Sequence, residues 1–354
     1  MHGWAVVESG MPLKEISSST PAPTGTQVLL KVTHCGVCHS DLYFQDGYYD
    51  LGGGKKLLLA DRGLKLPMVP GHEIVGKVVA FGPDAKGVAI GDQRIAYPWA
   101  GCGKCNRCLS DMEHLCLSPR SLGMFKSGGY GTHVLVDRPE HLVDFGNLDP
   151  ALMATYACSG LTAYSAVRKL PAISKEDPVV IFGAGGLGLS AINILRALSF
   201  TQIVVVDIDD KKLLAARTAG ATATVDGKCE NLAEAITHVA GAPITGVLDF
   251  VGSSATAKAG IDVLSKGGTY VPIGLYAGEI TLSLPMFPIR AISIRGSYTG
   301  SLSELKELVE LAKAGYLTAI PVERVPHANP NDALDRVRRG EVTGRLVLEV
   351  DASV

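Results

Sequence analysis

The sequence lacks the features that would place it in several large classes of protein. Its 33 basic and 35 acidic residues leave a net charge of −2. The basic residues are scattered, so no patch predicts binding to nucleic acid or to a membrane surface. Residues 1–13 lack a charged segment followed by an apolar one, so they predict a first strand in a cytoplasmic protein without a secretory signal.

A nearly continuous apolar run at residues 179–198 begins with glycines at positions 183, 185, 186 and 188. Clustered glycines are untypical of a membrane-spanning helix. They suit a tight turn between a buried strand and a packed helix. We therefore predict a strand at 179–182, a helix at 187–198, and a second strand at 203–206 that leads into Asp207.

Two patterns of secondary structure divide the chain. Before residue 100, short β-branched runs broken by Gly, Pro and Asp predict a β-rich, partly closed barrel. From about residue 155, strands alternate with helices, which predicts an α/β fold with a Rossmann-type, doubly wound parallel sheet. We place the domains at 1–156 and 157–297, and expect 298–354 to return to the first domain. That tail predicts a helix at 303–314 capped by Ser303, and a final strand at 344–350.

Four of the eight cysteines lie between residues 102 and 116, in the pattern C-x2-C-x2-C-x7-C. We expect thiols rather than disulfides in a cytoplasmic protein. Four thiolates this close in sequence complete a tetrahedral shell, which predicts a structural zinc lobe at 100–118. The spacing does not match the usual ferredoxin patterns of iron–sulfur proteins. The predicted ligands are Cys102, Cys105, Cys108 and Cys116.

A second set of metal ligands is dispersed along the chain: Cys38, His72 and Cys158. Two thiolates and one imidazole leave one zinc position open, which is the catalytic arrangement, so we predict that the fold brings these three side chains together. A redox pair of Cys35 with Cys38 is disfavoured, because no thioredoxin-like βαβ context surrounds it. Segment 45–66, between the first two ligands, is expected to be a loop. It either borders the active-site mouth or is a solvated insertion without a role.

The glycines from 183 to 188 form a G-x-G-x-x-G pattern between the predicted strand and helix. The first glycine makes the turn, the second lets the backbone approach a pyrophosphate, and the last lets helix and strand pack closely. Asp207 follows 19 residues after Gly188. There it would accept hydrogen bonds from the adenosine ribose and repel a 2′-phosphate, so we predict NAD rather than NADP. The turn residues predicted to bind it are Gly183, Gly185, Gly186, Leu187 and Gly188.

Together these motifs resemble those of the zinc-dependent medium-chain alcohol dehydrogenases, along nearly the whole length. The spacing between the cysteine lobe and Cys158 is similar to that of the tetrameric microbial members. The resemblance implies a GroES-like catalytic domain and a homotetramer or homodimer with two zinc ions per chain. The stretches that carry it are Gly36–Asp41, Gly71–Glu73, the cysteine lobe, Cys158–Thr162, Gly183–Gly188 and Gly344–Arg345.

The same resemblance implies roles for residues around the two sites. Glu73 lies behind the catalytic metal, Ser40 passes on the proton of the bound alcohol, and Asp41 contacts a ligand imidazole. Many relatives have a histidine where Tyr43 stands, so the proton leaves either through this phenol or through the ribose hydroxyl and water. Segment 45–66 is also longer than in most members. The implied contacts of the cofactor are His39, Thr162, Lys212, Ile273, Ser297 and Arg345.

The predicted function is the reversible, NAD-dependent oxidation of primary or secondary alcohols, including cyclic or aromatic ones, to aldehydes or ketones. A polyol or amino-alcohol dehydrogenase is the alternative, although such enzymes usually carry Glu where Cys158 stands. A zinc-free quinone reductase or a non-enzymatic binding protein would lack the three ligands. Trp99, Tyr298 and either Tyr48 or Tyr49 either line an apolar substrate pocket or are ordinary core aromatics.

Overall fold

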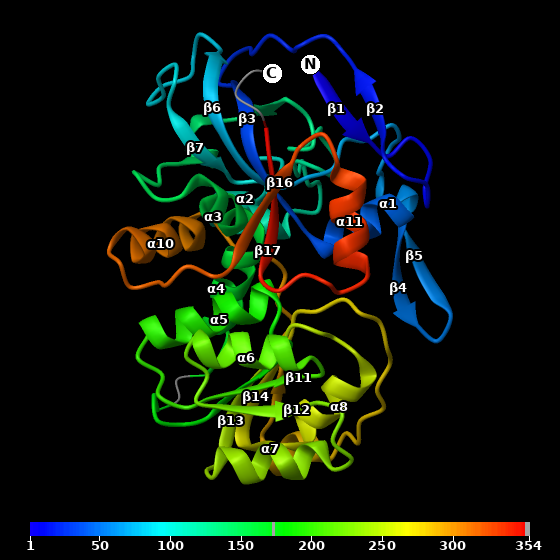
Figure 1. Ribbon diagram of the computed structural model, residues 1–354, viewed down its shortest axis with the longest axis vertical. Coiled ribbons are helices and arrows are strands. Elements are labelled where there is room, and N and C mark those ends of the chain that lie inside the picture. Colours follow the sequence, from blue (N-terminus) through cyan, green and yellow to red (C-terminus); the bar gives the residue numbers. More distant parts are fainter. Residues whose placement is uncertain (172–173, 351–354) are drawn as a thin grey trace.

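The computed structural model describes residues 1–171 and 174–350, and two large sheets organise these residues (Figure 1). The last four residues of the predicted 298–354 segment lie outside this range. A seven-stranded mixed sheet occupies the upper half of Figure 1, and a six-stranded parallel sheet occupies the lower half. The α/β architecture is therefore as predicted, whereas the two domain boundaries, after residues 156 and 297, stay predictions.

The mixed sheet joins both ends of the chain. Its central strand β3 pairs antiparallel with β6, and on its other edge with β17 near the C-terminus, where Leu346 lies opposite Val37. β-Branched and leucine side chains from these strands form a buried core. The strands are β3 Val28–Val37, β6 Glu73–Phe81, β7 Gln93–Ala96, β8 His133–Val136, β9 Leu142–Val143, β16 Val322–Pro326 and β17 Arg345–Glu349.

The parallel sheet is covered on both faces, as its almost wholly apolar strands require. Ile181 and Val205 face a core shared with α5 Gly186–Ala197 and α6 Asp210–Thr218. Val180 and Phe182 face the opposite core, with α7 Leu232–Ala240 and α8 Ser254–Asp262. The strands are, in spatial order, β12 Ala223–Asp226, β11 Ile203–Asp207, β10 Val179–Phe182, β13 Ile244–Asp249, β14 Leu264–Pro272 and β15 Ser293–Ile294.

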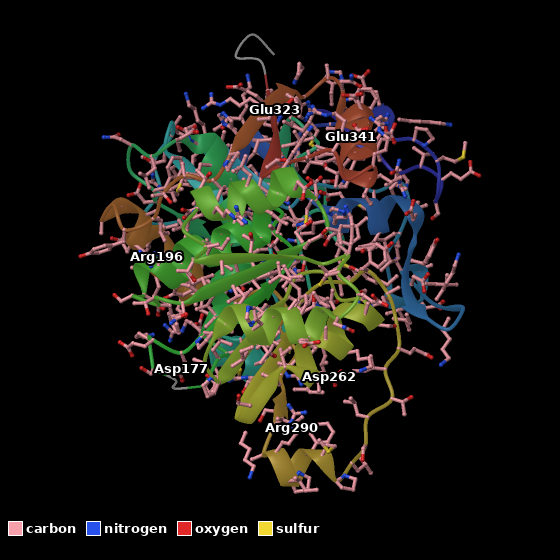
Figure 2. The ribbon with its side chains drawn as sticks, turned by 60° about the horizontal axis from the view of Figure 1, so that its bottom comes forward. Asp177, Arg196, Asp262, Arg290, Glu323 and Glu341 are labelled. Atoms are coloured by element: carbon pink, nitrogen blue, oxygen red, sulfur yellow. The ribbon has the colours of Figure 1, made fainter. Side chains whose placement is uncertain are left out.

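Shorter elements connect and flank the two sheets. No helix within 1–171 or 174–350 has both the length and the apolar character needed to cross a membrane. Figure 2 shows α9 projecting from the body of the molecule, with Arg290 at its end donating to the carbonyl oxygen of Ile261 at 3.1 Å. These elements are β1 His2–Ala5, β2 Lys14–Ser17, α1 His39–Asp46, α2 Asn106–Leu109, η2 Glu113–Leu115, η3 Pro139–His141, α3 Pro150–Thr155, η4 Tyr156–Gly160, α4 Leu161–Val167, α9 Met286–Arg290 and α11 Pro330–Arg338.

The predicted cap of the tail helix was wrong by two residues. Helix α10 spans Leu302–Lys313, and its N-cap is Ser301. The hydroxyl of Ser301 accepts from the Glu304 amide at 3.3 Å, and the Glu304 carboxylate accepts from the Ser301 amide at 2.9 Å. This reciprocal capping box needs an acid three residues after the cap, a spacing that Ser303 lacks.

The prediction of a loop at 45–66 was also wrong. The segment forms a hairpin of β4 Tyr48–Gly52 and β5 Lys55–Leu58, followed by the short helix η1 Ala60–Arg62. Gly52, Gly53 and Gly54 all have positive φ angles, between 56° and 84°, and so make the tight reversal that joins the strands. The glycine run that suggested a loop is the turn of this hairpin.

Candidate active site

The three dispersed ligands meet at the end of the β3–β6 pair. Cys38 follows β3 and caps α1, while His72 immediately precedes β6. Because Gly36 pairs with Glu73 across these strands, the two ligands leave the sheet side by side. Cys158 comes from the π-helical turn η4, a widened turn of the kind often found at functional sites. The ligand atoms of all three lie within 4.8 Å of one another.

The chemistry of this triad fits a zinc ion. All three residues are buried, and His72 Nε2 has no hydrogen-bond partner among the described residues. A hydrogen bond with Cys158 holds the pKa of Cys38 well below its ordinary value, even though burial opposes this. The same bond, together with burial, raises the pKa of Cys158. Two sulfur atoms and one imidazole nitrogen therefore converge, and loss of the Cys158 proton and of the proton on His72 Nε2 would complete the donor set of a catalytic zinc.

Asp41 holds the two segments that carry the first ligands. It is fully buried, and its carboxylate accepts hydrogen bonds from the amides of Cys38 at 2.9 Å and Gly71 at 3.1 Å. His72 Nδ1 lies 3.2 Å from Asp41 Oδ1. Burial alone would lower the pKa of His72, but the Asp41 carboxylate outweighs it and raises that pKa. A metal at Nε2 would leave the proton on Nδ1, facing Asp41.

Glu73 and Arg345 connect the triad to the glycine turn. Arg345 Nη2 donates to Glu73 Oε2 at 2.6 Å, and the Ser159 amide donates to Glu73 Oε1 at 2.9 Å. Burial raises the pKa of Glu73 although Arg345 opposes it. A Cβ added at Gly186 would lie only 2.2 Å from Arg345 Cδ, so this guanidinium stem packs on the first turn of α5. Arg345 therefore contacts Glu73, which follows His72 in sequence, and also contacts the predicted phosphate site.

Each glycine of the turn meets a different steric demand. Gly183 has a φ of 91°, in the left-handed region. A Cβ at Gly188 would lie 1.9 Å from the carbonyl oxygen of Gly183, so only glycine lets the helix start so close to the strand. A Cβ at Gly185 would meet no atom of the described chain within 4 Å, which leaves open space beside the backbone. These three environments suit the turn, packing and ligand-approach roles predicted from the sequence.

The predicted ribose-binding acid lies at the same edge of the parallel sheet. Asp207 ends β11, and its Oδ2 accepts from the Ala184 amide of the glycine turn at 2.7 Å. Its Oδ1 accepts from the Asp209 amide at 3.0 Å. Lys212 lies in the first turn of α6 and is half-buried.

The other predicted cofactor contacts lie in two helices and in two loops at the end of the parallel sheet. His39 is exposed at the start of α1, and Thr162 is buried in α4. Ile273 directly follows β14, and the Ser297 amide donates to the Pro272 carbonyl at 3.1 Å. The binding roles of these side chains stay predictions.

The two candidate proton-transfer residues differ in their surroundings. Ser40 is the second residue of α1 and is half-buried beside Cys38. Tyr43 lies one turn later, and its hydroxyl donates to the Leu275 carbonyl oxygen at 2.8 Å. Burial, helped by the Cys38 charge, raises the pKa of Tyr43 to about 12. The phenol is therefore engaged as a donor and is a poor proton acceptor near neutral pH.

Aromatic rings surround His72. The Trp99 ring lies 5.3 Å from the imidazole, and Tyr298 lies 6.0 Å from Trp99. Tyr49 packs on Tyr43 at 5.1 Å, whereas the Tyr48 ring lies under the Lys56 ammonium on the hairpin. Phe44, 5.9 Å from His72, was missed. Its position on α1, six residues after Cys38 and directly after Tyr43, was the available signal.

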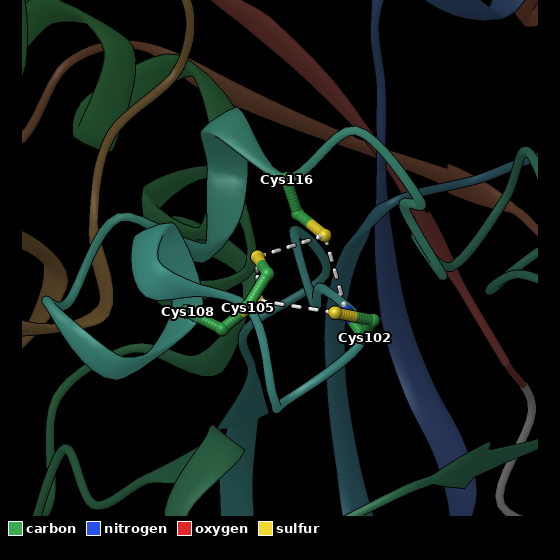
Figure 3. A group of neighbouring side chains, drawn as sticks. All are labelled: Cys102, Cys105, Cys108 and Cys116. Atoms are coloured by element: carbon green, nitrogen blue, oxygen red, sulfur yellow. Dashed lines mark hydrogen bonds between the residues drawn. The ribbon is translucent and has the colours of Figure 1, made fainter.

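The four-cysteine lobe forms a compact sulfur cage (Figure 3). Three of its Sγ–Sγ distances are 3.5, 3.8 and 3.9 Å. A tetrahedron with Zn–S bonds of about 2.3 Å has edges of about 3.8 Å, so the cage fits zinc. The amides of Cys102 and Ser118 donate to Cys116 Sγ at 3.3 and 3.4 Å. Amide hydrogen bonds also lower the pKa of Cys102 to about 6.

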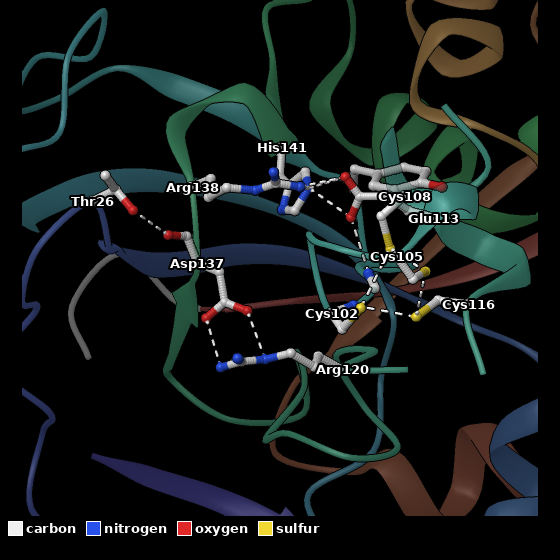
Figure 4. A network of polar contacts seen from close by, with 12 residues as sticks. Thr26, Cys102, Cys105, Cys108, Glu113, Cys116, Arg120, Asp137, Arg138 and His141 are labelled. Atoms are coloured by element: carbon white, nitrogen blue, oxygen red, sulfur yellow. Dashed lines mark hydrogen bonds and ion pairs between the residues drawn. The ribbon is translucent and has the colours of Figure 1, made fainter. Parts of the chain in front are cut away.

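A half-buried carboxylate, whose role the sequence does not reveal, connects this lobe to the segment between β8 and β9 (Figure 4). Glu113 accepts from the Gly101 amide at 2.9 Å and lies 3.3 Å from His141 Nε2; Arg138 also donates to it. Burial opposes ionisation, but His141 and the Gly101 amide lower the pKa of Glu113 to about 2. Glu113 thus resembles Asp41: each carboxylate accepts a hydrogen bond from a backbone amide next to the metal-binding residues of its site.

Two family models match the chain in sequence order. The alcohol dehydrogenase GroES-like domain matches residues 24–145, and the zinc-binding dehydrogenase domain matches residues 186–314. An NAD-dependent alcohol dehydrogenase of Sulfurisphaera tokodaii is 34% identical over 349 residues, covering 98% of this chain and 99% of the relative.

Solved structures are similar over the same length. The alcohol dehydrogenase of Aeropyrum pernix has a TM-score of 0.88 and 27% identity, covering 99% of this chain and 100% of that one. Acetophenone reductase from Geotrichum candidum, solved in complex with NAD, has a TM-score of 0.84 and 26% identity, covering 98% and 97%. Sequence and fold thus agree from end to end.

Proposed function

The chain belongs to the zinc-type medium-chain alcohol dehydrogenases, and from that premise we propose how its own residues carry out the reaction. It is an NAD-dependent oxidoreductase that interconverts alcohols with aldehydes or ketones. The observation that carries the residue assignment is the meeting of Cys38, His72 and Cys158 in a buried site that Arg345 connects to the glycine turn.

We assign Cys38, His72 and Cys158 as the ligands of the catalytic zinc, with Asp41 orienting the imidazole. A zinc ion held there supplies a Lewis acid that lowers the pKa of an alcohol hydroxyl. Glu73 keeps Arg345 in place below the ligands. We assign the second zinc to the four-cysteine lobe, which gives two zinc ions per chain.

Ser40 is the residue that takes the proton of the substrate hydroxyl. It shares the first turn of α1 with the exposed His39. As the Ser40 hydroxyl accepts the substrate proton it releases its own, which leaves through the ribose hydroxyl and water. Tyr43 does not accept that proton, because its own hydroxyl donates to Leu275 and its pKa is raised to about 12. Of the two routes that the sequence leaves open, we propose the one through water.

The glycine turn and Asp207 bind the dinucleotide. NAD supplies the hydride acceptor for the substrate carbon. The free amides at the start of α5 and the Arg345 guanidinium favour the pyrophosphate, and Asp207 disfavours a 2′-phosphate. The proposed contacts are completed by His39, Thr162, Lys212, Ile273 and Ser297.

Asp207→Ser should lower the ratio of kcat/KM with NAD to kcat/KM with NADP by at least about tenfold, which corresponds to about 1.4 kcal/mol.

The substrate class that suits the site is an apolar alcohol. Phe44 and Trp99 lie beside His72, and Tyr298 packs on Trp99. The solved acetophenone reductase acts on an aromatic ketone by its name. We propose secondary and aromatic alcohols as the preferred substrates. NADH formation with propanol, cyclohexanol, benzyl alcohol, 1-phenylethanol and sorbitol tests this. Preference for sorbitol would favour the polyol alternative, and preference for 1-phenylethanol would support the proposal.

We also propose a homotetramer or homodimer in the cytoplasm. The supporting observation is exposed apolar side chains on α9 and just before it: Leu284 is 78% exposed and Ile289 is 64% exposed. Leu109 and Leu117 on the cysteine lobe are also exposed, by 72% and 84%. Light scattering of the purified chain measures the assembly, and a mass of one chain would contradict it.

A further inference from the structure

The hairpin Tyr48–Leu58, here called the strap, reaches from the catalytic half of the molecule to the cofactor half. Its contact there is residues 275–279, here called the rim, which follow β14. Lys55 Nζ lies 2.8 Å from Glu279 Oε1. At the tip, a Cβ added at Gly52 would lie 2.8 Å from the carbonyl carbon of Gly278, so the two backbones touch.

The rim is held in one conformation by the helix behind it. Ser254 Oγ donates to the Glu279 carbonyl oxygen at 2.9 Å, and the Glu279 amide donates to Ser254 Oγ at 3.0 Å. Ala277 has a φ of 101°, a region that residues other than glycine rarely adopt. A backbone this constrained moves as a unit with α8, so the strap contact connects the two halves of the molecule and not merely two loops.

The rim also lies at the edge where the cofactor binds. It leaves the carboxyl end of β14, and the glycine turn leaves the carboxyl end of β10 in the same parallel sheet. Tyr43 donates to the rim at Leu275, and Tyr49 of the strap packs on Tyr43. The tip of the strap therefore contacts the rim directly, and the base of the strap contacts it through Tyr43.

We propose that the strap holds the rim against the catalytic half and thereby retains the cofactor, so that releasing the strap is a step in NADH dissociation. The inference rests on the dehydrogenase function above and deepens it by giving segment 45–66 a role. The contacts suit a reversible closure: the Lys55–Glu279 pair is 70% and 54% exposed, and such ion pairs are weak. Loss of NADH is often the slow step in enzymes that close around their cofactor.

Two glycines of the strap provide a matched test. Gly52 and Gly54 have similar positive φ angles, 84° and 76°, so alanine strains either backbone alike. Only at Gly52 does the new methyl group meet the rim; at Gly54 it meets no atom of the described chain within 4 Å. Stopped-flow displacement of NADH, without any alcohol present, should show dissociation about 3- to 10-fold faster in Gly52→Ala than in Gly54→Ala. Equal rates in the two variants would overturn the proposal.

A charge exchange tests the strap without changing the backbone. Lys55→Glu should accelerate NADH dissociation by about twofold, and adding Glu279→Lys should restore the original rate. If NADH dissociates from the double variant as fast as from the single variant, the proposed role of the strap is contradicted. If the wild-type chain binds no NADH, the cofactor assignment fails as well. If it binds NADH and all variants dissociate alike, the strap alone fails.

Discussion

The two cysteine sites are built in opposite ways. The lobe takes its four sulfurs from residues 102–116 and is held by local turns, with three of its cysteines partly exposed. The triad takes its residues from the end of β3, from just before β6 and from a π-turn, and all three are buried. A site made from a short segment forms whenever that segment binds metal. A site made from three distant elements forms only when the whole fold is correct.

This contrast predicts that damage to the two sites has different consequences. A metal held by the three triad residues would keep one position open, so the triad should control turnover. A metal held by four sulfurs would have a closed shell, so the lobe should control stability. Each site also has a carboxylate that accepts backbone hydrogen bonds beside it, the buried Asp41 for the triad and the half-buried Glu113 for the lobe. One variant of a cysteine and one of the neighbouring carboxylate in each site separate the effect on turnover from the effect on stability.

The largest effect should come from the third ligand of the triad. Cys158→Ala removes one donor, and turnover should fall by roughly 10³-fold or more, because the Lewis acid contributes several kcal/mol. Ser159→Ala is the matched control, since it alters the neighbouring buried residue and leaves the Ser159 amide bond to Glu73 intact. Steady-state NADH formation measures both, and equal activities would contradict the assignment of Cys158.

Loss of a lobe ligand should act on stability instead. Cys105→Ser opens the cage, and the free energy of unfolding should fall by at least about 3 kcal/mol, because metal binding orders the lobe. Cys229→Ser, which alters a cysteine outside both metal-ligand groups of the described chain, should change it by less than about 1 kcal/mol. Thermal unfolding followed by circular dichroism measures the difference. A Cys105→Ser chain as stable as the control would show that the lobe holds no structural metal.

The carboxylate beside the triad should have an intermediate effect on activity. Asp41→Asn keeps the shape but removes the charge facing His72 Nδ1, and zinc affinity and kcat should each fall about 10- to 100-fold. Tyr130→Phe removes only the hydroxyl that donates to Asp41 at 3.3 Å, and should cost far less. Titration with a competing chelator measures the affinity. Unchanged affinity in Asp41→Asn would mean that Asp41 only caps the backbone.

The carboxylate beside the lobe should give the smallest effect, visible as a pH dependence. The pKa of Glu113 is lowered from 4.5 to about 2, so its stabilisation, at most about 3 kcal/mol, is fully present above pH 4.5. It is lost as the pH falls through about 2. The stability difference between wild type and Glu113→Gln should therefore be constant from pH 6 to 8 and shrink on acidification from about 4.5. A difference independent of pH would contradict an ionised Glu113.

The contrast between the two sites also explains what the sequence could predict. Patterns with fixed local spacing were sufficient for the cysteine cage, the glycine turn and the alternation of strands and helices. The meeting of Cys38, His72 and Cys158 could be predicted only from their chemistry and the family resemblance, because no local spacing relates them. Glu113 and Phe44 were missed because their roles come from contacts across the fold. The strap was wrongly predicted to be a loop because three consecutive glycines are typical of loops, and the two strands beside them are only four and five residues long.

Metal stoichiometry tests the central claim, that three distant donors hold one zinc and four local ones hold another. Zinc per chain, measured by atomic absorption on the same preparations, should be two in the wild type and one in both His72→Ala and Cys105→Ser. The remaining zinc of His72→Ala should accompany a stable, inactive protein. A His72→Ala chain that keeps two zinc ions and full turnover would contradict the account.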